Sequence, residues 1–222
     1  MMPVETLAGQ LIDLFATLML LIAFAMLAQR RVLTLIHLFA LQGAALVAST
    51  ALVGYLTHQP HLYISAALTL VLKVFLIPWL LHRVIDRLSV RWDVEMLINI
   101  PTTLLIGIVL VIFAFNIAAP IAQLSSSIAR GTLGIALACV LLAFMMMITR
   151  SKAVPQVIGF LAMENGLFFA ATSATYGMPM VVELGIALDV LVGVFILGIF
   201  FFQIREQFES LDLHHLETLK ED

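Results

Sequence analysis

Residues 7–28 read LAGQLIDLFATLMLLIAFAMLA, and this apolar run, with one acidic side chain at Asp13, indicates the class of fold. A helix needs about 20 mostly apolar residues to cross the hydrocarbon core of a bilayer. Six more runs of this kind follow, at 32–56, 62–82, 101–122, 131–149, 155–175 and 181–203. The sequence therefore predicts an all-α, polytopic membrane protein with seven transmembrane helices.

The composition of the whole chain supports this class. Hydrophobic residues make up 63% of the 222 residues and charged residues 11%, and the mean hydropathy is +1.13. Soluble domains average about 45–50% apolar and about 25% charged residues. The single cysteine, Cys139, excludes a disulfide framework and an iron–sulfur cluster held by several thiolates. Basic residues are scattered, so we expect no nucleic-acid partner, and no motif predicts a bound cofactor or metal.

Lysine and arginine predict the orientation, because they concentrate in cytoplasmic loops. In the seven-span topology nine of the eleven lie on one side, Lys73 lies inside a span, and one lies on the other side. The sequence thus predicts a multi-pass protein of the cell (inner) membrane, with the N-terminus outside and the C-terminus cytoplasmic. The nine are Arg30, Arg31, Arg83, Arg87, Arg91, Arg150, Lys152, Arg205 and Lys220, and the one opposite is Arg130.

A weak internal repeat suggests how the spans are organised. The segment 36–43, IHLFALQG, can be laid over 158–165, IGFLAMEN, which pairs Gln42 with Glu164. A shorter outer loop then pairs Lys73 with Asp189. The implied plan is three spans, a linking span and three more, although two apolar helices can always be aligned in this way. The units are 1–100, with an amphipathic interfacial segment or docking surface at 83–99, then 101–130, 131–204 and a cytoplasmic tail at 205–222.

Three ionisable side chains lie deep inside the expected spans. From a rise of about 1.5 Å per residue, Glu164 lies roughly 14 Å, Lys73 roughly 16 Å and Asp189 roughly 12 Å from the nearer end. These depths are close to the middle of a core about 30 Å thick. Charges in a membrane are costly and usually functional. Two interpretations stay open: a proton relay, because burial brings carboxyl and amine pKa values toward neutrality, or a static pair that fastens helices together.

Other polar residues are weaker candidates. Glu183 and Asp13 lie near span ends, where an interfacial acid is expected, and His37 is expected to make a polar helix contact. His58 and His61 share a short loop without further metal ligands. Two asparagines, Asn116 and Asn165, are expected to hydrogen-bond between helices, and Pro78 to loosen the third span and free backbone carbonyls.

The segment 159–166, GFLAMENG, resembles the hydrogenase-4 component E family. The resemblance continues through 182–189, VELGIALD, and the tail 211–220, LDLHHLETLK. The last three spans are also similar to the K-type subunit of respiratory complex I and to the C subunit of multisubunit cation/proton antiporters. The resemblance implies proton transfer by Glu164, Asp189, Lys73 and Glu183, although Asp189 has a shorter reach than the glutamate expected there.

The function implied is that of a non-redox membrane-arm subunit in a complex I-like, energy-converting hydrogenase such as formate hydrogenlyase. Antiporter-like and quinone-site-like membrane subunits, and a hydrogenase or dehydrogenase module, would be its partners. The chain would belong to an oxidoreductase complex without carrying a redox centre and would assist proton or sodium translocation. The alternatives are a subunit of a cation/proton antiporter without a redox partner, and a structural membrane adaptor.

Overall fold

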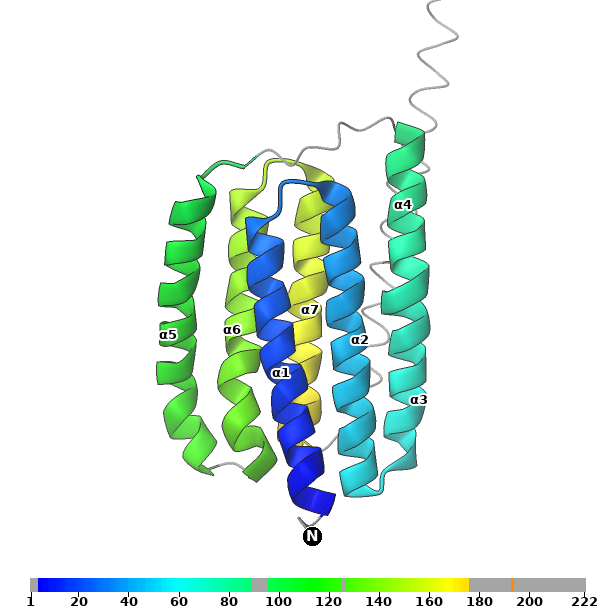
Figure 1. Ribbon diagram of the computed structural model, residues 1–222, viewed down its shortest axis with the longest axis vertical. Coiled ribbons are helices and arrows are strands. Elements are labelled where there is room, and N and C mark those ends of the chain that lie inside the picture. The colour runs from blue at the N-terminus through cyan, green and yellow to red at the C-terminus, as the bar shows by residue number, and fades with distance from the viewer. Residues whose placement is uncertain (1–3, 89–95, 125–126, 176–192, 194–222) are drawn as a thin grey trace, which may run out of the picture. The chain divides into compact units, whose positions relative to one another are not determined.

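The computed structural model describes residues 4–88, 96–124, 127–175 and 193. The chain divides into two units, residues 1–186 and 187–222, and the helices described here belong to the first. All of them are labelled in Figure 1 except η1, a π-helix that lies between α3 and α4. They are α1 (Val4–Ala28), α2 (Val32–Thr57), α3 (Pro60–Thr69), η1 (Leu70–Leu76), α4 (Ile77–Leu88), α5 (Ile100–Leu124), α6 (Ser127–Thr149) and α7 (Ala153–Thr175).

Six of the expected transmembrane helices are confirmed as helices long and apolar enough to cross a membrane. One of them combines α3, η1 and most of α4 into a single span, Pro60–Arg83. The expected seventh span, 181–203, lies outside the described residues, so the seven-span count and the plan of three, one and three spans stay predictions. The six spans are Leu7–Ala28, Val32–Thr57, Pro60–Arg83, Ile100–Pro120, Thr132–Thr149 and Val154–Ser173.

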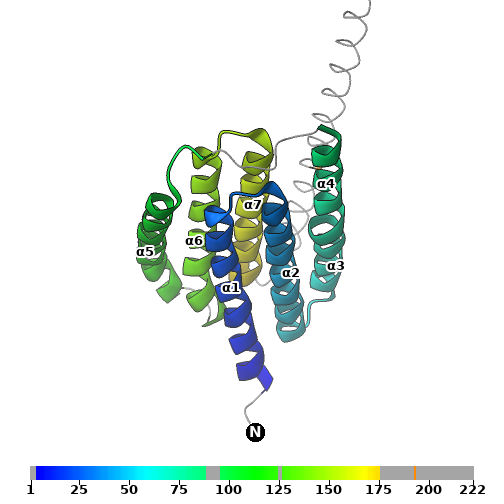
Figure 2. The same cartoon turned by 45° about the horizontal axis from the view of Figure 1, so that its top comes forward.

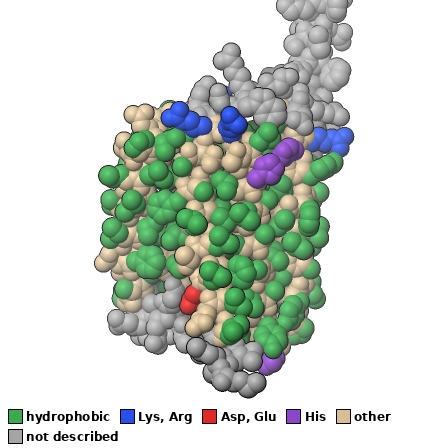
Figure 3. Space-filling view, in the orientation of Figure 1, with side chains coloured by type: hydrophobic (Ala, Val, Ile, Leu, Met, Phe, Trp, Pro, Cys, Tyr) green, Lys and Arg blue, Asp and Glu red, His purple; other side chains and the backbone are tan. Residues whose placement is uncertain are grey.

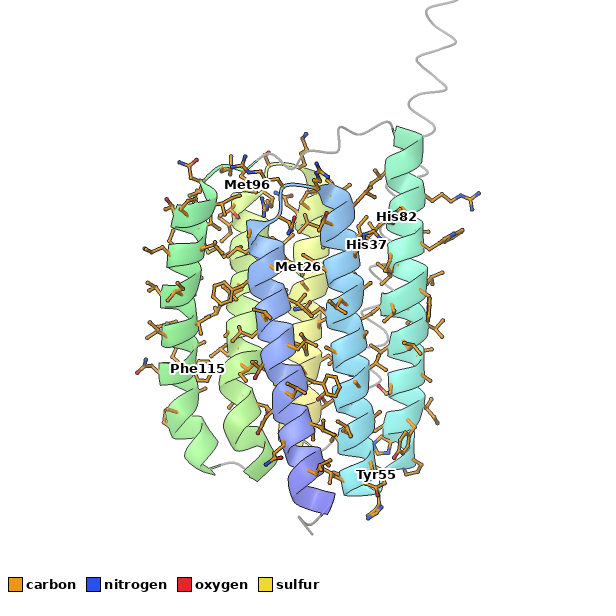
Figure 4. The ribbon with its side chains drawn as sticks, viewed as in Figure 1. Met26, His37, Tyr55, His82, Met96 and Phe115 are labelled. Atoms are coloured by element: carbon orange, nitrogen blue, oxygen red, sulfur yellow. The ribbon has the colours of Figure 1, made fainter. Side chains whose placement is uncertain are left out.

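Consecutive spans run in opposite directions, and all of them except the third and fourth pack side by side. Helix α1 contacts α2, α5 and α6, while α2 also contacts α7 and the α3–η1–α4 span (Figures 1 and 2). Helix α5 packs on α6, and its Phe115 points toward α6 (Figure 4), where a Cβ atom at Gly134 would lie 2.8 Å from the ring. This small residue allows the two helices to approach closely. Helix α2 thereby contacts both the third span and α7.

The apolar side chains on the outside of this unit are those expected of a lipid-facing or subunit-facing surface. Helix α5 exposes Leu105, Ile108 and Phe113, each more than half exposed. The space-filling view shows hydrophobic side chains spread over the face between the two ends (Figure 3). A hydrophobic exterior around buried polar side chains is the arrangement of helices in lipid.

The two ends of the unit differ in charge. Five basic residues lie at the end where α2 and α7 begin, which we call the basic end. They are Arg30, Arg31, Arg83, Arg150 and Lys152. Lys and Arg side chains are seen at this end of the space-filling view (Figure 3). The guanidinium of Arg83 lies 5.1 Å from the centre of the Trp79 ring, a combination common at a membrane boundary. The opposite end, where α2 turns into α3 through His58, is called the turn end. This distribution agrees with the alternation predicted from the lysine and arginine pattern.

Candidate intramembrane ion-pair site

A buried ion pair lies between the third span and α7. The Nζ atom of Lys73 is 3.5 Å from Oε1 of Glu164, and the two side chains are 1% and 3% exposed. The structure therefore brings together two of the four predicted proton-transfer residues. The other two, Asp189 and Glu183, lie outside the described residues.

The local backbone around Lys73 departs from an α-helix. Lys73 lies in the middle of η1, and the N–H group of Ile77 donates to the carbonyl of Leu72, five residues earlier. Pro78 has no N–H group, and its ring would clash with the carbonyl four residues earlier in an α-helix. The wider π-turn relieves this conflict and confirms the predicted loosening at Pro78. Single π-turns of this kind often occur at functional sites.

Close helix packing places Glu164 opposite Lys73. On α7, a Cβ atom at Gly166 would lie 3.0 Å from the Val140 side chain of α6, and one at Gly159 would lie 2.9 Å from Met147. These two glycines are seven residues apart and therefore lie on one face of α7. They hold α7 against α6, so that Glu164 faces the third span.

Helix α2 approaches the same site from a third side. A Cβ atom at Gly43 would lie 3.3 Å from the Cβ atom of Lys73, so a larger residue there would press on the lysine. The neighbouring residue, Gln42, accepts a hydrogen bond through Oε1 from Nδ2 of Asn165 at 3.3 Å, and both residues are fully buried. Gln42 and Glu164, which the internal repeat aligns, thus belong to one site, and the prediction that Asn165 bonds between helices is confirmed.

The Phe168 ring borders the site, 5.9 Å from Nζ of Lys73. An aromatic face attracts a cation, and it does so more strongly where water is excluded. The ammonium group therefore lies between a carboxylate and a ring in a setting without bulk water. Such a lysine–carboxylate contact can hold or release a proton when the distance between the two groups changes, which is the chemistry required of a relay.

Arg150 has a structural role that the distribution of basic residues along the sequence does not predict. Its side chain is 1% exposed, and Nη2 donates to the carbonyl oxygens of Leu27 at 2.8 Å and Met26 at 3.4 Å. These carbonyls belong to the last turn of α1, where a cation is favourable. Burial lowers the pKa of Arg150 to about 10, so the guanidinium remains charged at neutral pH. A low exposed fraction could not be read from the sequence.

The structure places the weaker candidates away from the ion pair. Asp13 is exposed on α1, and the rings of His37 and His82 meet edge to face at 5.4 Å between α2 and α4 (Figure 4). The prediction for Asn116 is wrong, because its Nδ2 donates to the Ile112 carbonyl of its own helix at 2.7 Å.

Metal binding has no support in the described part of the chain. His58 adopts a left-handed conformation, with φ of 52°, at the end of α2, and His61 lies in the first turn of α3. No group of three or more His, Cys, Asp or Glu side chains that could hold a metal ion occurs among residues 4–88, 96–124 and 127–175.

Comparisons with known proteins give relatives over most of the chain. The chain is 33% identical over 212 residues to uncharacterized protein Rv0085 of Mycobacterium tuberculosis, which covers 95% of this chain and 96% of the relative. It is 23% identical over 182 residues to hydrogenase-4 component E of Escherichia coli (strain K12) and of Shigella flexneri, covering 82% of this chain and 84% of each relative. No family model and no solved structure gives a match.

Proposed function

Since the chain belongs to the same family as uncharacterized protein Rv0085 and is a distant relative of hydrogenase-4 component E, we propose that it is a membrane subunit of a complex I-like, energy-converting hydrogenase. It would carry no redox centre. Its task would be to assist translocation of protons, or of sodium, in the membrane arm of the complex.

The single observation that supports this role is the buried contact between Lys73 and Glu164 at 3.5 Å. Opposite charges in the middle of a membrane span usually mark an ion or proton path. A buried pair contributes little net stability, because desolvation offsets most of the attraction. The Lys73–Glu164 pair is therefore better explained by a role in proton transfer than by a role in holding the helices together. In this proposal Asp189 and Glu183 extend the same relay.

The proposal includes an orientation in the membrane and a set of neighbouring subunits. The basic end faces the cytoplasm, the turn end faces outward, and the protein resides in the cell (inner) membrane. The apolar faces, such as that of α5, contact lipid or the antiporter-like and quinone-site-like subunits. A hydrogenase or dehydrogenase module would bind to the cytoplasmic side of the assembled arm.

The first prediction tests Glu164 in the assembled complex. Glu164→Gln keeps the size of the side chain and most of its hydrogen bonding but removes the titratable proton. We expect the complex to assemble and proton translocation to fall at least about 100-fold, the lower end of the contribution of a positioned proton-transfer group. The measurement is acidification or fluorescence quenching in sealed membrane vesicles, normalised to the amount of complex recovered through an affinity tag in mild detergent.

Two further variants serve as controls. Glu164→Asp keeps a carboxyl group with a reach shorter by one methylene and should retain more translocation than Glu164→Gln. Gln10→Glu makes the reverse change at an exposed position of α1 and should leave translocation unchanged. Full translocation in an assembled Glu164→Gln complex would contradict an essential relay at this residue, and a loss only in proportion to poor assembly would favour the structural adaptor.

A further inference from the structure

Helix α5 is the described span with the least contact to the rest of the unit. Of an 18-residue apolar stretch in each span, 22% is buried in α5 and 39–56% in the other five. The helix packs on α6 and α1, and it lies at the left edge of the described helices in Figure 1. Most of its surface therefore faces away from the other described helices.

One face of α5 is packed, and the opposite face is exposed. A Cβ atom at Gly107 would lie 3.1 Å from side chains of both α6 and α1, so Gly107 belongs to the packed face. Each residue turns the helix by about 100°, so a residue two positions after a buried one lies almost opposite to it. Leu105, Val109 and Asn116 each follow a buried residue in this way. The buried residues on the packed face are Thr103, Gly107, Ala114 and Ala118.

The exposed residues opposite the packed face form a regular stripe. Leu105, Val109, Ile112 and Asn116, which we call the outer stripe, follow one another at intervals of four, three and four residues. Leu105 is 65% exposed, Val109 and Ile112 are 57% exposed, and Asn116 is exposed. This is the heptad spacing of two paired helices. Valine at one core position, leucine at the other and a single asparagine favour a parallel pair.

Asn116 places polar groups on this otherwise apolar stripe. It lies four residues inside the Ile100–Pro120 span, about 6 Å from its end. Its Nδ2 atom donates to the Ile112 carbonyl at 2.7 Å, which leaves the second amide hydrogen and Oδ1 for a partner. Pro120 has no N–H group to donate to the Asn116 backbone carbonyl one turn earlier. Polar groups that face lipid are costly, and a neighbouring helix usually satisfies them.

We propose that the outer stripe binds α5 of a second copy of this chain, with Asn116 of one copy hydrogen-bonded to Asn116 of the other. Two copies share one orientation in a membrane, so a twofold axis along the membrane normal brings each residue to its equivalent at the same depth. The amide is self-complementary, because Oδ1 of each copy accepts from Nδ2 of the other. No charged residue occurs between Ile100 and Leu124, so no like charges of α5 meet across the axis.

This pairing goes beyond the proposed function and does not depend on it. The ion pair lies between the third span and α7, whereas the outer stripe belongs to α5. Each copy therefore keeps its own ion pair, and the contact joins two assembled complexes. The exposed apolar side chains elsewhere on the unit remain for lipid and for other subunits of the same complex.

Disulfide cross-linking of the whole complex in native membranes tests the pairing. In a Cys139→Ala background, Val109→Cys or Ile112→Cys is treated with a mild oxidant, and the covalent dimer of the chain is measured by non-reducing electrophoresis and mass spectrometry. The matched controls are Ile106→Cys and Ile117→Cys, which are 37% and 42% exposed but each lie about 100° from the stripe residue before them. Since a disulfide requires Cα atoms within about 7 Å, we expect at least about tenfold more dimer from the stripe positions.

A second measurement changes Asn116 itself. Asn116→Leu removes both symmetry-related hydrogen bonds but keeps an apolar span, whereas Asn116→Gln keeps an amide. We expect the dissociation constant of the paired complexes to rise about fivefold to tenfold in the leucine variant, as expected for two hydrogen bonds between membrane helices, and to change less in the glutamine variant. The constant is measured by mass photometry of the complex diluted in mild detergent.

The outcomes separate the pairing from other occupants of the outer stripe. Equal dimer yields at stripe and control positions would overturn it. A cross-link from a stripe cysteine to a different subunit would also overturn it and identify that subunit as the occupant, and no cross-link at any position would leave lipid or another helix there. None of these results affects the relay at Glu164. Normal translocation by Glu164→Gln would contradict the relay and leave the pairing intact.

Discussion

Lys73 and Arg150 are both cations that are only 1% exposed, yet they are satisfied in different ways. Lys73 lies in the middle of a span and meets a titratable carboxylate. Arg150 lies at the basic end and meets the two carbonyl oxygens that end α1, neither of which can take up or release a proton. The difference separates two uses of a buried charge: one contact joins two ionisable side chains in the middle of a span, while the other completes a helix terminus.

The largest effect on stability should follow from removing Arg150. Arg150→Met leaves the Met26 and Leu27 carbonyls without their donor and removes a cation from the end of α1. We expect the free energy of unfolding to fall by about 3 kcal/mol or more, since a hydrogen bond to a charged group contributes about 1.5–3 kcal/mol and the helix dipole adds to it. The measurement is the thermal unfolding of the purified complex in mild detergent, together with its yield.

The comparison also predicts what Arg150→Met leaves intact. Translocation per assembled complex should stay close to that of the parent protein, because the guanidinium contacts backbone carbonyls away from the ion pair. The pKa of Arg150, lowered to about 10 by burial, lies below its ordinary value but far above neutrality. The guanidinium is thus charged in both the folded and the unfolded chain at pH 7. The difference in unfolding free energy between Arg150→Met and the parent protein should therefore not change with pH near neutrality. Arg150→Lys keeps the charge and should lose less stability than Arg150→Met. If Arg150→Met lost translocation while the complex still assembled normally, the contrast between Lys73 and Arg150 would be wrong.

A double-mutant cycle at Lys73 and Glu164 should give a smaller effect on stability and a larger one on activity. Lys73→Met removes the cation that Glu164 contacts, whereas Lys73→Met combined with Glu164→Gln removes both charges of the pair. We expect a coupling energy of about 2 kcal/mol, within the range for residues in contact, with the double variant more stable than Lys73→Met alone. Both variants should be impaired in translocation. A double variant that regains stability and translocation would show that the pair is static.

Much of the fold and part of the site follow from the sequence. Hydropathy and the polar breaks between apolar runs predict the ends of the six membrane spans to within about two residues, because lipid requires long apolar runs. The common depth of Lys73 and Glu164 follows from the rise of a helix, and Pro78 predicts the irregular backbone beside them. These features depend on local sequence or on the one-dimensional position along the membrane normal.

The remaining features depend on rotation about helix axes and on which helices are neighbours. Asn116 and Asn165 look alike in sequence, yet one faces outward and bonds to its own helix while the other faces α2. The distribution of basic residues predicts only that Arg150 lies on the cytoplasmic side. It does not predict that the Arg150 side chain caps α1. Serines are nearly neutral in hydropathy, so the sequence does not show that Ser49 and Ser65 are buried.

The smallest expected effect concerns the amide pair beside the ion pair. Gln42→Leu removes the acceptor of the 3.3 Å hydrogen bond from Asn165, and hydrogen bonds between membrane helices average about 0.6 kcal/mol in stability. Asn165 precedes Gly166 and follows Glu164, so loss of its bond also loosens the backbone that carries the carboxylate. We therefore expect a small loss of stability and a modest decrease in translocation. Thr50→Val is the matched control, because Thr50 is equally buried on α2 but bonds to the Leu46 carbonyl of its own helix. If Thr50→Val and Gln42→Leu lower translocation equally, the amide pair has no special part in positioning Glu164, and the effect belongs to α2 packing in general.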